Sequence, residues 1–241
     1  MILRPLHPEP GDAITVGAPG ARERLRELYR RDADAPGIRL NLIASIDGSA
    51  QGDDGTSASL SSRADRAVLG AIRAESDVVL VGAATMRAEG YLVPRTARLA
   101  VLTVSGELGA AAVGEVPDAD KLIVLAPEAA RTRVAATLAA PHRFVALEPT
   151  AAGRVRPADA LAALRALGAR SIVSEGGPSL AAALLDAGLV GELCLSTSPR
   201  LTGGGLPVLG GSRPAIDARL ASLLVDDAGG LYARWLLPVR G

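Results

Sequence analysis

Short apolar runs and amphipathic stretches alternate along most of the chain. The apolar runs are rich in Val, Ile and Leu and are flanked by Gly, Pro or Asp, which is typical of buried strands. They predict strands at 38–46, 77–82, 98–104, 121–126, 143–147, 170–174 and 190–197. Helices are predicted between them at 62–74, 84–89, 127–139, 157–168 and 178–187. This alternation predicts an α/β fold with a mostly parallel central sheet that is flanked by helices.

The N-terminal part has a different pattern. Residues 1–20 are rich in Pro and Gly and predict an extended arm, and residues 21–31 carry apolar positions at helical spacing. Pro36-Gly37 ends that unit. We therefore treat residues 1–37 as an N-terminal arm and helix.

The C-terminal part is also distinct. The apolar segments 219–226 and 231–238 flank Gly229-Gly230. Two strand-like segments around a glycine turn predict an antiparallel hairpin, which we expect at one edge of the sheet. No Pro-, Gly- or Ser-rich linker interrupts the chain after residue 38, so residues 38–241 are expected to form one domain.

Composition and charge narrow the possible functions. The chain has 241 residues, is 49% hydrophobic and can bury a sizeable core. Its 26 basic and 26 acidic residues balance, so no basic excess favours nucleic acid or an anionic membrane surface. Neither a membrane-spanning run nor a signal-peptide pattern is present. With Cys194 as the only cysteine, these features predict a cytoplasmic protein.

Polar segments follow several predicted strands, where doubly wound sheets bind their ligands. Asp47-Gly48 leads into a hydroxyl-rich loop over residues 52–62, and Gly82 precedes a predicted helix. Each of these also fits an ordinary turn or a flexible loop. The segment 174–180 is the stronger phosphate cradle, because a strand runs into two glycines and then into Pro at a helix start. Three consecutive glycines at 203–205 indicate either a closely approached loop or a plain surface loop.

Other chemistries lack their residues. His7 and His142 are the only histidines and lie far apart in the sequence, so a histidine-dependent triad or a zinc site is not expected. The H-x-E and P-C-x-x-C pattern of zinc deaminases is absent. A G-x-G-x-x-G motif does not follow the first predicted strand, which excludes an ordinary Rossmann domain. No metal is therefore expected.

An ordered set of short motifs resembles the reductase family of riboflavin biosynthesis, which has a dihydrofolate reductase-like fold. The matching pieces are ASIDG (44–48), SLSS followed by ADR (59–66), IRA (72–74), DVVLVGAATMRAE (77–89), SEGGPSL (174–180) and LVGELCLSTSPRLTGGG (189–205). No single motif is specific for this family, but the order of the motifs along the chain is. The resemblance implies a sheet of about eight or nine strands, NADPH as hydride donor, a small-molecule substrate and a homodimer.

The resemblance also implies roles for individual residues. Those expected to hold NADPH are Ser59, Gly82, Thr85, Ser105, Gly176, Gly177, Pro178, Ser179 and Leu180. Those expected to face the substrate are Asn41, Ser57, Arg73, Glu89 and Glu175. Arg73 would bind the substrate phosphate. Glu89 would orient or protonate the opening sugar and is the expected catalytic residue.

The chain departs from the family pattern on the substrate side. Asn41 stands where the family usually has Lys, and Glu89-Gly90-Tyr91 where it has Asp-Asn-Pro or Asp-Asp-Pro. An expected arginine near position 96 is missing, although Arg95 is adjacent. The predicted function is 5-amino-6-(5-phosphoribosylamino)uracil reductase. An NADPH reductase of another pteridine or pyrimidine, such as dihydrofolate, and a nucleotide-binding protein without turnover remain alternatives.

Overall fold

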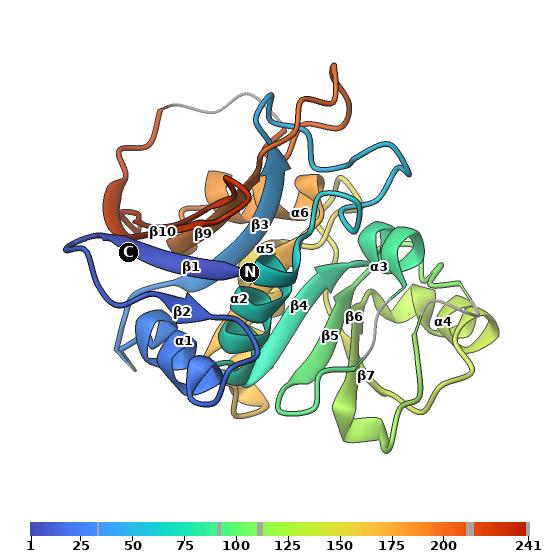
Figure 1. Cartoon of the computed structure of the whole chain (residues 1–241). Coiled ribbons are helices and arrows are strands. Elements are labelled where there is room, and N and C mark those ends of the chain that lie inside the picture. The colour runs from blue at the N-terminus through green and yellow to red at the C-terminus, as the bar shows by residue number, and fades with distance from the viewer. Residues whose placement is uncertain (33, 91–92, 110–112, 211–214, 240–241) are drawn as a thin grey trace.

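The computed structural model describes residues 1–32, 34–90, 93–109, 113–210 and 215–239. Its strands form one sheet in the order β2-β1-β10-β11-β9-β3-β8-β4-β5-β6-β7 (Figure 1). The strands are β1 (Ile2–His7), β2 (Ile14–Thr15), β3 (Ile38–Ser45), β4 (Val78–Gly82), β5 (Arg98–Leu102), β6 (Leu122–Ala126), β7 (Arg143–Ala146), β8 (Ile172–Gly176), β9 (Val190–Ser198), β10 (Arg219–Asp226) and β11 (Leu231–Leu236). The α-helices are α1 (Ala21–Tyr29), α2 (Arg63–Ala74), α3 (Ala83–Glu89), α4 (Arg131–Thr137), α5 (Pro157–Ala166) and α6 (Pro178–Asp186). Two 3₁₀ turns, η1 (Ala119–Lys121) and η2 (Glu128–Ala130), complete the elements of the described ranges.

The sheet has a parallel and an antiparallel half. The strands from β9 through β3, β8, β4, β5 and β6 to β7 pair in parallel. The remaining pairs, β9 with β11, β11 with β10, β10 with β1, and β1 with β2, are antiparallel. The α/β fold, the mostly parallel sheet and the C-terminal hairpin are thereby confirmed. The expected eight or nine strands were too few, since the sheet has 11 within the described ranges.

Helices cover both faces of the parallel half (Figure 1). On one face, α1 to α4 pack against outward side chains such as Val79 and Val101 in one buried cluster. On the other face, α5 and α6 pack against Leu80 and Ile123 in a second cluster. Burial on both faces explains why these strands are continuous apolar runs rather than alternating ones.

The N-terminal residues form part of the sheet. Residues 2–7 were predicted as an extended arm but form β1, which pairs with β10 along its length. The C-terminal hairpin was expected at one edge, and this was wrong, because β1 and β2 lie outside it. Pro5 has no amide hydrogen to donate to a neighbouring strand. Because β2 pairs only with Ile2 and Leu3, β1 is an edge strand at Pro5, where a proline is tolerated. The domain boundary at residue 37 stays a prediction.

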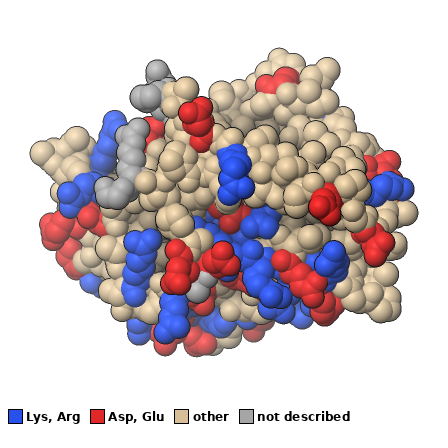
Figure 2. All heavy atoms as spheres, turned by 90° about the vertical axis from the view of Figure 1, so that its left-hand side faces the viewer, with Lys and Arg blue, Asp and Glu red and all other residues tan. Residues whose placement is uncertain are grey.

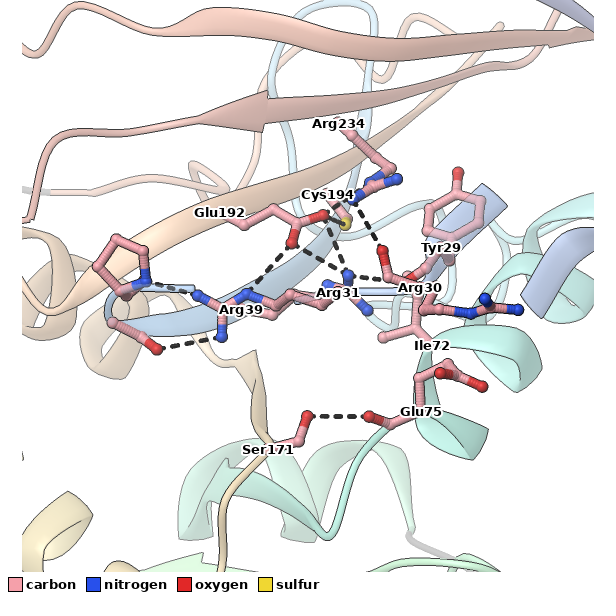
Figure 3. A network of polar contacts seen from close by, with 12 residues as sticks. Tyr29, Arg30, Arg31, Arg39, Ile72, Glu75, Ser171, Glu192, Cys194 and Arg234 are labelled. Carbon is pink, nitrogen blue, oxygen red and sulfur yellow. Dashed lines mark hydrogen bonds and ion pairs between the residues drawn. The ribbon is translucent and has the colours of Figure 1, made fainter. Parts of the chain in front are cut away.

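A buried ionic cluster joins α1 to the sheet (Figure 3). The carboxylate of Glu192 on β9 lies 2.7 Å from Arg234 Nε, 3.0 Å from Arg39 Nη2 and 3.4 Å from Arg31 Nε. The arginines also cap the end of α1, since Arg39 donates to Tyr29 O at 2.8 Å and Arg234 donates to Leu28 O. Cations at a helix C-terminus satisfy its last carbonyl groups and oppose its dipole.

Burial is the largest effect on Glu192 and disfavours its charge, but Arg39 and Arg234 outweigh it and lower the pKa of the carboxyl. Burial also raises the pKa of the neighbouring Cys194 thiol to about 12. A thiol that stays protonated at neutral pH is a poor nucleophile. Cys194 is therefore a packing residue of this cluster.

The visible surface carries both signs of charge. On the face shown in Figure 2, basic and acidic side chains intermingle over the lower half, at the height of α1, without a large patch of one sign. No helix of the described ranges is long and apolar enough to cross a membrane.

Candidate active site

A cavity of about 630 Å³ opens at the carboxyl ends of β3, β4 and β8. Its walls come from β3, the loop after it, α2, α3 and the start of α6. This is the edge of a parallel sheet at which α/β proteins bind ligands, and the volume lies within the range of small-molecule sites. The candidate site therefore lies where the strand order predicts it.

The turn from β8 into α6 forms one wall. Gly176 has φ 76°, and Gly177 precedes Pro178, the first residue of α6. The Gly177 N–H donates to Thr85 Oγ1 at 3.0 Å, and a Cβ on Gly177 would lie 2.3 Å from that oxygen. The backbone can approach a ligand here because the turn has no side chains. Pro178, Ser179 and Leu180 at the start of α6 line the cavity, and a helix start, where N–H groups lack helical partners, suits a phosphate.

Glu89, at the end of α3, is held by the hydroxyl-rich loop. Its Oε1 accepts a hydrogen bond from Ser57 N at 2.8 Å and its Oε2 accepts one from Ser57 Oγ at 3.0 Å. Two donors from one residue fix the plane of the carboxylate. Other hydroxyls of this loop also donate to the chain's own carboxylates, Ser59 to Asp54 and Ser61 to Asp65.

Arg73 and Glu175 form an ion pair on the cavity wall. Arg73 Nε lies 2.6 Å from Glu175 Oε1, and Arg73 Nη2 lies 2.7 Å from Glu175 Oε2. The side chain of Glu175 is only 6% exposed. The strand predicted at 170–174 continues to Gly176, so Glu175 lies within β8 rather than on the turn that follows it. A phosphate that binds Arg73 would share the guanidinium with this carboxylate.

Asp65 is a site residue that the sequence interpretation missed. Ser62 caps the start of α2, since its Oγ accepts hydrogen bonds from Ala64 N and Asp65 N at 3.1 Å. The Asp65 side chain turns inward, accepts from Ser61 Oγ at 2.7 Å and lines the cavity. Burial raises the pKa of Asp65, against the hydrogen bonds from Ser61 and Ser196. A signal for this placement is that Asp65, Val68 and Ile72 share one helical face.

A second cavity of about 300 Å³ lies next to the first and shares Ile43, Ser61 and Asp65 with it. Tyr232 and Asp226 line it, and the Tyr232 hydroxyl lies 2.7 Å from Asp226 Oδ2. Burial is the main reason that the pKa of Tyr232 is raised. The wall is otherwise rich in Ser and Thr hydroxyl groups.

Most of the predicted site residues line the main cavity together. These are Asn41, Ser57, Gly82, Thr85, Arg73, Glu89, Glu175, Gly177, Pro178, Ser179 and Leu180. Ser59 instead borders the second cavity, and Gly176 lies behind the turn, where a Cβ would be 2.9 Å from Leu42 Cδ2.

Ser105 is exposed in the turn after β5, where its hydroxyl accepts from Glu107 N at 3.2 Å, and it does not line the cavity. Among the positions where the sequence departs from the family pattern, Asn41 lines the cavity. Arg95 is exposed and does not line it. Tyr91 lies outside the described residues.

Comparison with known proteins gives a consistent picture. A model of the RibD C-terminal domain family matches residues 36–231. The chain is 30% identical over 182 residues to the riboflavin biosynthesis protein RibD of Mycobacterium tuberculosis, and the match covers 75% of this chain and 47% of that protein. The chain thus spans about half the length of the curated relatives it matches.

Solved structures share the fold. A pyrimidine reductase-like protein from Corynebacterium diphtheriae superimposes with a TM-score of 0.69 at 21% identity, covering 95% of this chain and 98% of that one. The diaminohydroxyphosphoribosylaminopyrimidine deaminase/5-amino-6-(5-phosphoribosylamino)uracil reductase of Thermotoga maritima gives 0.66 at 19% identity, covering 84% of this chain and 57% of that one. At these identities the likeness establishes the fold.

Proposed function

The chain belongs to the RibD C-terminal domain family, and from that membership we propose that it is an NADPH-dependent reductase. The proposed substrate is 5-amino-6-(5-phosphoribosylamino)uracil, whose sugar carbon is reduced to give the ribityl product. The observation that carries the proposal is one cavity with a side-chain-free turn and helix start on one wall and carboxyl groups on the others.

The residues present fit the cofactor. Gly177 lines the cavity and has no side chain, so its backbone can lie against a pyrophosphate. The start of α6 would hold that group, with Gly82 and Thr85 on the neighbouring strand end and helix. NADPH, when bound, supplies the hydride. Since a carboxylate repels phosphate, we place the pyrophosphate away from Glu89 and Glu175.

The substrate side would use the fixed carboxyl groups. When the sugar is reduced and opens, its ring oxygen must gain a proton. We assign the delivery of that proton to the protonated form of Glu89, and the carboxylate that remains would be held by the two donors of Ser57. Glu175 orients Arg73, and the part of its guanidinium that faces the cavity would attract the substrate phosphate. A homodimer in the cytoplasm completes the proposal, as the family resemblance implies.

A second candidate function is the reduction of dihydrofolate. Asp65 is a buried carboxyl group that lines the cavity, and it suits a ligand that presents adjacent N–H donors. The 2-amino-4-oxo edge of a pterin has such a pair, and the aminouracil substrate has one in its ring N1–H and the N–H of its ribosylamino group, so Asp65 fits either base. The departures from the family pattern at Asn41 and Glu89, which both line the cavity, favour a changed substrate.

One experiment separates the two. NADPH oxidation is followed through the absorbance of the reduced nicotinamide with the aminouracil ribosyl phosphate and, separately, with dihydrofolate. Turnover with the first substrate alone supports the riboflavin assignment, and turnover with dihydrofolate alone supports the second candidate. No turnover with either, together with tight NADPH binding, would contradict both and favour a nucleotide-binding protein or another substrate.

A further inference from the structure

The loop after β3 and the glycine-rich loop after β9 lie side by side and form a flap, which we define as residues 46–51 and 200–208 (Figure 1, upper part). Backbone hydrogen bonds join its halves: Ile46 N donates to Arg200 O at 2.8 Å and Ala50 N donates to Leu206 O at 2.7 Å. Ser49 and Pro207 form an antiparallel bridge between them. The two loops therefore form one unit, although about 150 residues separate them in sequence.

The flap supplies part of the cavity wall. Ala50 and Gln51 line the cavity from the first loop, and Leu206 and Val208 line it from the second. None of these residues has a group that reacts with a substrate. Their contribution is shape and the exclusion of water, which depends on where the flap is held.

One side chain holds the tip of the flap. The carboxylate of Asp47 accepts from the backbone N–H groups of Thr202, Gly203 and Gly204, with Oδ2 at 3.1, 2.9 and 3.3 Å. Thr202 Oγ1 donates to the same carboxylate, at 3.2 Å from Oδ1. Successive N–H groups that converge on one point form an anion-binding nest, and here the anion is the chain's own aspartate.

The glycines make the nest possible. Gly203 and Gly204 have φ of 74° and 112°, a region that L side chains rarely adopt. At Gly205 a Cβ would lie 2.6 Å from Ser49 Oγ, so the loop can approach its neighbour only without a side chain. The glycine run is therefore built for this contact.

We propose that Asp47 is a positioning residue, whose carboxylate holds the flap in place and so sets the wall that the flap presents to the substrate. The effect on catalysis rests on the proposed reductase function. The clamp, by which we mean the contacts of Asp47 with residues 202–204, does not rest on that function, because it can be measured in the protein without ligands.

The test compares Asp47→Ala with Asp53→Ala, an exposed aspartate of the adjacent loop. Hydrogen exchange of the amides of residues 202–204 is measured without ligands. In Asp47→Ala these amides should exchange at least about tenfold faster, while amides of β3 and β9 and the thermal midpoint stay near their original values. Asp53→Ala should change neither the exchange of the amides of residues 202–204 nor the thermal midpoint. Unchanged exchange at residues 202–204 in Asp47→Ala would overturn the clamp.

The second readout is kinetic. With the substrate that the protein reduces, Asp47→Ala should raise KM about 10- to 100-fold and change kcat less, since the reacting groups remain. Asp47→Asn keeps the shape and one acceptor oxygen and should give an intermediate KM. Formate can occupy the vacated nest, so it should lower the KM of Asp47→Ala and slow the exchange, whereas chloride at equal ionic strength should not. An unchanged KM despite faster exchange would overturn the positioning role.

If the unsubstituted protein turns over none of the substrates, the proposed function fails. The exchange and formate measurements then still support or overturn the clamp by themselves.

Discussion

Arg73 on α2 and Glu175 on β8 are joined by two parallel hydrogen bonds of 2.6 and 2.7 Å. Both residues line the cavity, and the pair connects α2 to β8 of the sheet. The Glu175 side chain is only 6% exposed, so water can replace little of the contact with Arg73 if that contact is lost. The pair therefore allows one test of stability and one of the proposed ligand binding.

Removing either partner should destabilise the protein. We expect Arg73→Met to lower the free energy of unfolding by up to about 3 kcal/mol, since Arg73 is partly exposed and the loss lies at the lower end for buried pairs. The double variant Arg73→Met with Glu175→Met should recover part of that loss in urea denaturation. A double variant that loses the sum of both single effects would contradict a direct pairing.

The same arginine allows a test of the substrate phosphate. Arg73→Ala should raise KM for the phosphorylated substrate by about 10- to 100-fold, which corresponds to a lost charge-assisted hydrogen bond. For the dephosphorylated analogue KM should change little. Equal effects on both compounds would show that Arg73 acts only through the position of Glu175.

Glu89 offers a test of proton delivery. In Glu89→Gln the amide has a single acceptor oxygen, so only one of the two carboxylate oxygens that Ser57 contacts remains. The amide also has no acidic proton to deliver. We expect kcat to fall about 10²- to 10⁴-fold while NADPH binding, measured by fluorescence, stays within a few-fold of the original. Ser57→Ala is the control for orientation and should reduce kcat less, since the Ser57 N–H still donates to the carboxylate. A Glu89→Gln variant with full kcat would remove Glu89 from the mechanism.

The turn at Gly177 allows a double-mutant cycle. In Gly177→Ala the new Cβ would lie 2.3 Å from Thr85 Oγ1, so the turn or Thr85 must move, and NADPH should bind at least about tenfold more weakly. Thr85→Ala removes the clashing oxygen. The double variant should therefore bind NADPH better than Gly177→Ala alone. If instead the two losses simply add, the clash is not the cause.

Asp65 predicts a pH dependence of stability. Its pKa is raised by burial, so the folded protein holds this proton to higher pH than the unfolded chain does. Its contribution is complete below the unfolded pKa of about 3.9 and is lost as pH rises through the folded pKa. The stability of Asp65→Asn relative to the original protein should therefore increase as the pH rises above about 4 in thermal denaturation. A difference that is constant with pH would contradict the raised pKa.

The ionic cluster at Glu192 should make stability depend on pH in the opposite direction. Its lowered pKa means that its contribution is present above the unfolded pKa and is lost as pH falls through the folded pKa. At neutral pH, Glu192→Gln should cost about 3–5 kcal/mol in urea denaturation, because the buried arginines lose their shared counter-charge. Glu27→Gln, which breaks an exposed pair with Arg24, is the matched control and should have little effect. Similar losses in both variants would contradict the role of burial.

The sequence predicted the parallel half of the fold well, because strands buried on both faces are written as unbroken apolar runs. The runs at 77–82 and 121–126 correspond to β4 and β6 within one residue at their starts. β1 was missed for two physical reasons. Its partner β10 lies more than 200 residues away in sequence, and Pro5 within it is atypical of a strand unless the strand is at an edge.

The site was predictable in part for a similar reason. Glycines and hydroxyls at strand ends are local signals, and most of these residues line one cavity. The pairing of Arg73 with Glu175 joins residues 102 positions apart and has no local signal. Asp65 was missed because an aspartate in the first turn of a helix is also what capping favours, and only the packing of α2 decides where it points.

The pairing of β1 with β10 also affects the order in which the protein folds. During synthesis the residues of β1 emerge long before those of their main partner β10, as with Pro5 and Leu224. Closing such a long loop is slow, and an unpaired strand is open to wrong partners until it closes. The antiparallel half should therefore form last, after the parallel half around β3, β4 and β8 has provided β9 as its template.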